Sequence, residues 1–164
     1  MKNNILSILQ TFQSKNAVSS SDFIVGGSAC GVYTDCLTID TLSDVDIYVL
    51  NNVRCRHCPG TDLLARMLYL PDWKDRLLEK DGFYFLSPLD LLVQETAGAL
   101  LKQKSSTINN VMQLLSYLNM TVDEYIPILD TALAINTERK KDVMVANKSL
   151  LYEWEAARDS KTEL

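Results

Sequence analysis

Two aspartates set one residue apart are the side chains in this sequence whose type and spacing best suit chemistry. Asp44 and Asp46 stand at the start of Val45–Leu50, a run of β-branched and aromatic residues that predicts a strand. Alternate side chains of a strand share a face, so we expect both carboxylates on one face. Two like charges are costly to bury. The pair therefore predicts either a bound cation, for which one or two Mg²⁺ ions are suitable, or a solvated edge.

A glycine turn lies upstream of the aspartates. Phe23–Val25 predicts a short strand, Gly26 and Gly27 end it, and Ser28 begins a helix that we expect to run to about Cys36. Free backbone amides and the helix dipole attract phosphate at such a turn, and glycine lets the backbone approach closely. A phosphate-holding turn beside a metal-holding strand fits nucleotidyl transfer from a nucleoside triphosphate. Taken alone, the two glycines also suit a plain turn.

The elements that must position these residues follow from apolar periodicity and capping signals. Ile5, Ile8, Leu9 and Phe12 repeat at helical spacing. The predicted helices are 3–15, 28–36, 61–68, 88–103, 107–118, 121–135 and 138–158, and the predicted strands are 23–25, 45–50 and 83–85.

Two of these helices carry clear start signals. Ser87-Pro88-Leu89-Asp90 has a serine cap, a proline in the first position and an acid in the first turn. Thr121-Val122-Asp123-Glu124 has the capping-box pattern. The predicted fold class is therefore mixed α+β: a small sheet with flanking helices in residues 1–86, followed by a helical part in residues 87–164 packed on it.

Composition limits the functional classes. The chain has 164 residues, 47% of them hydrophobic, which is enough to form a globular core. A net charge of -5 argues against a broad nucleic-acid-binding surface, although a local basic groove stays open. The sequence shows neither a signal peptide nor an apolar run of about 20 residues. We therefore expect a cytoplasmic protein with reduced thiols and no membrane contact.

The Cys55-Arg56-His57-Cys58 segment invites a zinc interpretation. A structural zinc site needs four ligands, and the only cysteines left for it are Cys30 and Cys36, which are not a closely spaced pair. His57 is the single histidine of the chain, so a hydrolytic triad is not expected either. The segment is better interpreted as a solvated basic loop.

The quoted motifs resemble a known signature. Val25-Gly26-Gly27-Ser28 followed by Ser43-Asp44-Val45-Asp46-Ile47 resembles that of the polymerase-β-like nucleotidyltransferase superfamily. Within it, residues 70–76 and 86–92 and the short helices up to Tyr125 are similar to the AbiEii-type, toxin-like branch, so the resemblance covers residues 22–126. It implies the nucleotidyltransferase-type sheet.

The resemblance also implies an activity and its site. The implied activity is Mg²⁺-dependent transfer of a nucleotide from a nucleoside triphosphate to an RNA, a tRNA or another acceptor. The implied setting is a toxin–antitoxin or phage-defence system with a cognate protein partner. Asp44 and Asp46 would be the catalytic, metal-binding residues. The expected nucleotide-binding residues are Gly26, Gly27, Ser28, Ser43 and Lys102.

This chain departs from the branch in its helical part. Glu95 stands where that branch usually has a lysine, and Ser106, Thr107 and Asn110 stand near a usual Lys-Asp pair and a further aspartate. Lys102 or Lys104 is a candidate replacement for a basic residue that contacts phosphate. The departures favour an alternative: a catalytically degenerate nucleotidyltransferase-fold protein that binds a nucleotide or a protein partner. A purely structural interaction domain is a third, weaker interpretation.

Overall fold

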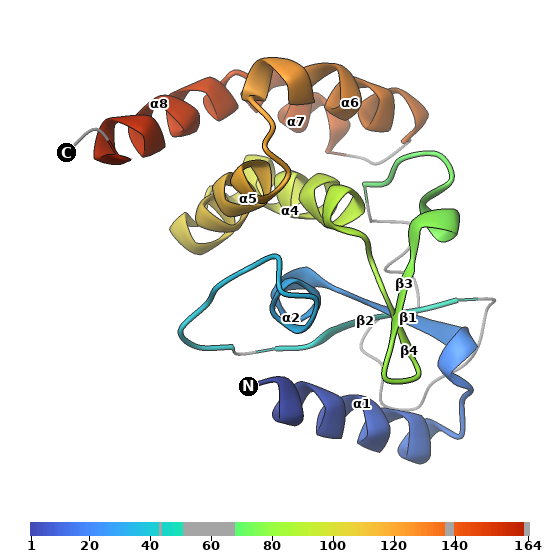
Figure 1. Cartoon of the computed structure of the whole chain (residues 1–164). Coiled ribbons are helices and arrows are strands. Elements are labelled where there is room, and N and C mark those ends of the chain that lie inside the picture. The colour runs from blue at the N-terminus through green and yellow to red at the C-terminus, as the bar shows by residue number, and fades with distance from the viewer. Residues whose placement is uncertain (43, 51–67, 137–139, 163–164) are drawn as a thin grey trace. The chain divides into compact units, whose positions relative to one another are not determined.

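The computed structural model describes residues 1–42, 44–50, 68–136 and 140–162 (Figure 1). The chain divides into two compact units. The first unit comprises Met1–Met67 and Asp72–Leu91, and the second comprises Leu68–Pro71 and Leu92–Leu164. The fold is mixed α+β, as the sequence predicted, and the described residues form one small sheet of four strands where the sequence predicted three.

The first unit contains the sheet. Its elements are α1 (Lys2–Asn16), η1 (Ser20–Asp22), β1 (Phe23–Gly26), α2 (Gly27–Tyr33), β2 (Asp46–Val49), η2 (Trp73–Arg76), β3 (Leu78–Lys80) and β4 (Phe83–Phe85). The strand order is β2-β1-β4-β3; β1 runs antiparallel to β2 and parallel to β4 (Figure 1). Strands β3 and β4 form an antiparallel hairpin, which Asp81 and Gly82 close with positive φ angles.

Apolar residues of α1 and α2 form the core of the first unit with the strands. Ile5 and Leu9 are completely buried, one turn apart on α1, which confirms the predicted amphipathic helix. The Phe12 ring meets the Phe23 ring edge-on, with centroids 5.0 Å apart. The α1 helix is therefore held by packing against β1, because its own sequence is too short to be stable alone.

The second unit is helical. Its helices are α4 (Pro88–Lys102), which begins in the first unit, α5 (Ser105–Tyr117), α6 (Val122–Ile135), α7 (Lys141–Asn147) and α8 (Leu150–Thr162). The predicted capping box at the start of α6 is confirmed, because the Glu124 amide donates to the Thr121 hydroxyl (3.2 Å) and the Thr121 amide donates to Glu124 (3.1 Å). Tyr125 is completely buried, and its hydroxyl lies 2.8 Å from that of Thr96.

The prediction of one long helix over residues 138–158 is wrong. The chain forms α7 and α8 instead, and the amides of Lys148 and Leu151 make short-range i→i−3 hydrogen bonds at the break. The Asn147 side chain donates to the carbonyl of Leu100 (2.8 Å). Asparagine and serine side chains compete with helical hydrogen bonding, so this tertiary contact interrupts the helix at Asn147–Ser149.

Two predicted boundaries in the first unit also need correction. Helix α2 ends at Tyr33 rather than Cys36, because Asp35 adopts a left-handed conformation (φ 64°) and the Cys36 amide turns back to the Gly31 carbonyl (2.9 Å). Strand β2 begins at Asp46, one residue after the predicted start. The predicted helix over residues 61–68 lies outside the described residues except for Leu68, which is not helical.

Within the described ranges, no helix combines the length and apolar character needed to cross a membrane.

Candidate functional site

The two sequence motifs of the first unit lie side by side. Strand register pairs Gly26 with Asp46, so the glycine turn and the second aspartate meet at one end of the β1–β2 ladder. Gly27 has φ +64°, and a Cβ atom built on it would lie 2.9 Å from Cγ and 3.1 Å from Cβ of Asp46. Only glycine fits this position, because its backbone packs directly against the Asp46 side chain.

Both aspartate side chains are exposed. Asp46 is the first residue of β2, while Tyr48 and Val49 at the other end of that strand are buried. Asp44 precedes the strand, so strand alternation places only Asp46, and the predicted shared face of the two carboxylates stays a prediction. Since neither acid is buried, the sequence argument that burial demands a cation no longer holds.

The acid pair nevertheless fits Mg²⁺. This ion keeps several water ligands and commonly takes one or two carboxylates together with substrate phosphates. Among the described residues, no three or more histidine, cysteine, aspartate or glutamate side chains are grouped to hold a metal ion. Asp44 and Asp46 therefore suit an open site completed by a ligand, and they do not form a closed, all-protein metal site.

The predicted attraction of phosphate to the glycine turn depends on a short helix. Helix α2 has seven residues, and its N-cap Gly26 makes no side-chain cap. A helix of about two turns has a small macrodipole. Gly27 is buried and Ser28 is half-buried at its start. A ligand could approach the backbone closely at Gly27. A cation would be needed to neutralise the charge of a phosphate bound there.

The remaining predicted residues lie either outside the described residues or in the second unit. Ser43 and the Cys55–Cys58 segment lie outside the described residues. Lys102 is the exposed last residue of α4, in the second unit, and its phosphate contact stays a prediction. Asn110 is buried in α5, and its amide donates to Glu95 of α4 (3.4 Å), so these two departures from the family pattern form a contact between helices.

A charged network occupies the other end of α2. The Tyr33 hydroxyl donates to Asp81, and burial together with that contact raises the pKa of Tyr33 to about 12. The Lys2 ammonium (2.6 Å) and the Lys80 ammonium (3.7 Å) flank Asp35, and the hydrogen bond from Lys2 is the main cause of its lowered pKa. These groups are engaged with one another, so they link α1, α2 and the β3–β4 hairpin and do not form a ligand site.

A buried ion pair anchors the start of α4. The Asp90 side chain is 2% exposed and accepts hydrogen bonds from Nε (2.9 Å) and Nη2 (2.8 Å) of Arg76 and from the Ser87 hydroxyl (2.5 Å). The hydrogen bonds to Asp90 are the main cause of the raised pKa of Arg76. The sequence identified Ser87 and Asp90 as a helix start, but no local signal pointed to Arg76 as their partner.

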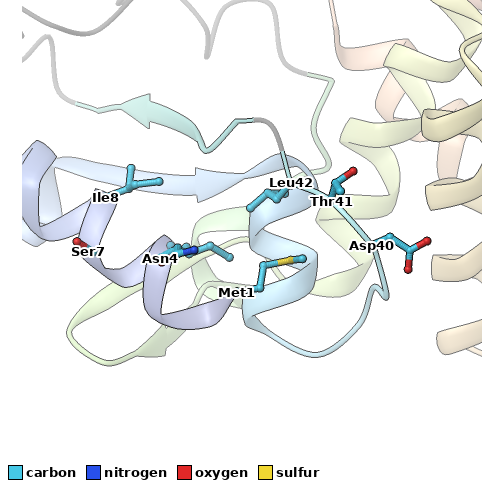
Figure 2. Close-up of a pocket in the computed structure, with 8 residues that line it drawn as sticks. Met1, Asn4, Ser7, Ile8, Asp40, Thr41 and Leu42 are labelled. Atoms are coloured by element: carbon cyan, nitrogen blue, oxygen red, sulfur yellow. The ribbon is translucent and has the colours of Figure 1, made fainter.

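Sequence reasoning missed a pocket in the first unit. It has a volume of about 630 Å³ and lies between α1 and the loop before β2 (Figure 2). The lining residues are Met1, Asn4, Ile5, Ser7, Ile8, Asp40, Thr41 and Leu42. The one available signal was Ile8: it follows the apolar spacing of α1, yet it is 47% exposed and faces no core.

Comparison with known proteins adds no residue to this site. No family model matches the chain, and neither a curated protein nor a solved structure matches it. The candidate site is therefore defined by the residues themselves: the Gly26–Gly27 turn, Asp44, Asp46 and the pocket of the first unit.

Proposed function

We propose that this protein is a Mg²⁺-dependent nucleotidyltransferase with a nucleotidyltransferase-type sheet, of the AbiEii toxin-like type. The observation that carries the proposal is the packing of the Gly27 backbone against the Asp46 side chain. The residue before it, Gly26, pairs with Asp46 across β1 and β2. This contact unites the two halves of the signature that the sequence resembles. Exposed Asp44 lies two residues away along the chain.

Asp44 and Asp46 would hold the metal ion, and Gly26 and Gly27 would admit the triphosphate close to the backbone. Bound Mg²⁺ would neutralise negative charge on the phosphates. Without it, two exposed carboxylates would repel a polyphosphate, so binding should require the metal. Ser28, Ser43 and Lys102 are the further nucleotide contacts of this proposal.

The resemblance also supplies the proposed acceptor and setting. The nucleotide would pass to an RNA or tRNA, in a toxin–antitoxin or phage-defence system with a cognate protein partner. The net charge of -5 leaves room for an RNA acceptor only at a local basic surface.

Calorimetric titration tests the site. Each of the four nucleoside triphosphates is titrated with Mg²⁺ into the wild type, Asp44→Asn and Asp46→Asn. Glu79→Gln, an exposed acid on β3, is the matched control. Each aspartate variant should weaken binding by about 100-fold, because several kcal/mol of charge neutralisation is lost. The proposal fails if no triphosphate binds the wild type, or if the aspartate variants bind as the control does.

A second candidate is the same fold binding a nucleotide without transferring it. The contact between Asn110 and Glu95 favours it, because residues at or near positions where the branch carries basic and acidic groups are used for helix packing. This candidate predicts metal-dependent triphosphate binding without transfer. Incubation of labelled triphosphate with total cellular RNA separates the two: label on RNA that disappears in Asp44→Asn supports the transferase, and binding without label supports the binding protein.

A further inference from the structure

The pocket of about 630 Å³ and the proposed metal site are connected along the chain, because Leu42 lines the pocket and Asp44 follows two residues later. The early turns of α1 form one wall, and residues 40–42 form the other (Figure 2). Leu42 lies two residues before Asp44, so covalent geometry keeps their Cα atoms within about 7 Å of each other. The Leu42 wall of the pocket is therefore within reach of a ligand whose phosphates lie at Asp44.

The lining suits an uncharged group better than a phosphate. Met1 and Ile8 are apolar and 48% and 47% exposed. Leu42 points toward α1, whereas Asp40 points away from it (Figure 2). The lining of this pocket, among the described residues, includes no lysine, arginine or histidine side chain, and its single charged side chain, that of Asp40, is an acid. Apolar surfaces are available to cover a flat ring.

Polar groups in the lining can recognise the edge of such a ring. Asn4 presents a carboxamide, which offers both a donor and an acceptor, and this pattern is the one asparagine uses to read a nucleobase edge. Ser7 and Thr41 add hydroxyl groups. The volume lies within the range of about 300–1,000 Å³ that is typical of small-molecule sites.

We propose that this pocket holds the nucleobase of the triphosphate. Met1, Ile8 and Leu42 cover the ring, and Asn4 contacts its polar edge. The inference rests on the proposed function, because it assigns the base end of the same ligand. It makes α1 the element that selects the nucleotide, a role that the signature motifs do not give to it.

Two adjacent asparagines provide the test. Asn4 lines the pocket, whereas its exposed neighbour Asn3 does not. Asn4→Trp should fill the pocket and weaken binding of the preferred nucleoside triphosphate by about tenfold or more, while Asn3→Trp should bind as the wild type does. Both variants leave the buried residues of α1, Ile5 and Leu9, unchanged, and circular dichroism checks that both fold.

Inorganic tripolyphosphate with Mg²⁺ separates this inference from the proposed function, because it has the phosphates but no base. Tripolyphosphate binding should depend on Asp44 and be unchanged in Asn4→Trp. In addition, Asn4→Ala should reduce the preference among the four nucleoside triphosphates. Two results would overturn the inference and leave the metal site standing. In one, Asn4→Trp binds nucleoside triphosphates as tightly as Asn3→Trp does. In the other, Asn4→Trp loses as much affinity for tripolyphosphate as for nucleoside triphosphates. If neither ligand binds the wild type, both fall.

Discussion

Acidic side chains have different roles in the two units. In the first unit, Asp44 and Asp46 are exposed beside the glycine turn, where a ligand can reach them. In the second unit, acids connect helices α6 and α8. The three contacts are Lys148 to Asp130 (2.8 Å), Tyr152 to Asp123 (2.7 Å) and the Val122 amide to Glu155 (2.7 Å).

Helical spacing explains the second arrangement. Tyr152 and Glu155 are three residues apart, so they lie on one side of α8, and their partners Asp123 and Val122 are neighbours at the start of α6. Lys148 lies before α8, at the end of α7. The Glu155 contact also satisfies a backbone group that the start of α6 leaves open, the Val122 amide. These acids of the second unit thus serve assembly, whereas Asp44 and Asp46 of the first unit are the acids for which we propose ligand binding.

Arg76 and Lys148 provide the largest expected contrast. Both make an ion pair of 2.8 Å, but the Asp90 side chain is 2% exposed whereas that of Asp130 is 49% exposed. Arg76→Met should lower the free energy of unfolding by about 3 kcal/mol, because it leaves a buried carboxylate without its counter-ion. Lys148→Met should lower it by less than about 1 kcal/mol.

Urea unfolding followed by tryptophan fluorescence measures both variants. Trp73 belongs to the first unit and Trp154 to the second, so each unit has its own probe. Equal losses of stability in the two variants would contradict the distinction between a buried and a surface ion pair.

The glycine turn gives the next effect in size. Gly27→Ala should destabilise the protein by about 2 kcal/mol or more, because a left-handed alanine costs about 1–2 kcal/mol and its Cβ meets the Asp46 side chain. Gly82→Ala is the control, since its φ is +84° but nothing lies near its Cβ position. The difference between the two free energies of unfolding isolates the contact with Asp46. Equal values would mean that Asp46 moves aside without cost.

A smaller effect is expected in the second unit. Glu155→Ala should lower the free energy of unfolding by about 1 kcal/mol, because the Val122 amide at the start of α6 loses its acceptor. Glu153→Ala, an exposed acid on the same helix, is the control. Thermal unfolding compares the two. A loss as large in Glu153→Ala would argue against the assembly role given to Glu155.

The last prediction concerns how the stability of the fold changes at alkaline pH. Burial raises the pKa of Tyr33 to about 12, above the usual value of 10.0, so the folded state keeps this proton after the unfolded state has lost it. The stabilisation is complete below pH 10 and is lost as the pH rises from 10 toward 12. Tyr33→Phe should therefore flatten the fall of the urea midpoint over that range. An unchanged slope would show that Tyr33 does not contribute to it.

Several features of this fold could be predicted because their signals are local. The cap at Thr121 and the apolar spacing of Ile5 and Leu9 are contained within one or two helical turns. The glycine turn and the acid pair were also visible as motifs. Their meeting in register, Gly26 beside Asp46, follows from antiparallel pairing of two strands that are consecutive in the chain, with α2 between them.

Other features could not be predicted because their causes are distant in the sequence. Strand β3 has two charged residues among its three and exists through its pairing with β4. The break between α7 and α8 depends on the contact of Asn147 with Leu100. The partner of Asp90 is Arg76, fourteen residues earlier.

The sequence by itself determined the types of the elements and the residues able to do chemistry, since periodicity, caps and motifs act over a few residues. The tertiary structure alone decided that Asp44 and Asp46 are exposed, and that Asn4 and Leu42 line one pocket. Exposure and pockets depend on which surfaces the packed elements leave uncovered, and segments far apart in the chain determine those surfaces together.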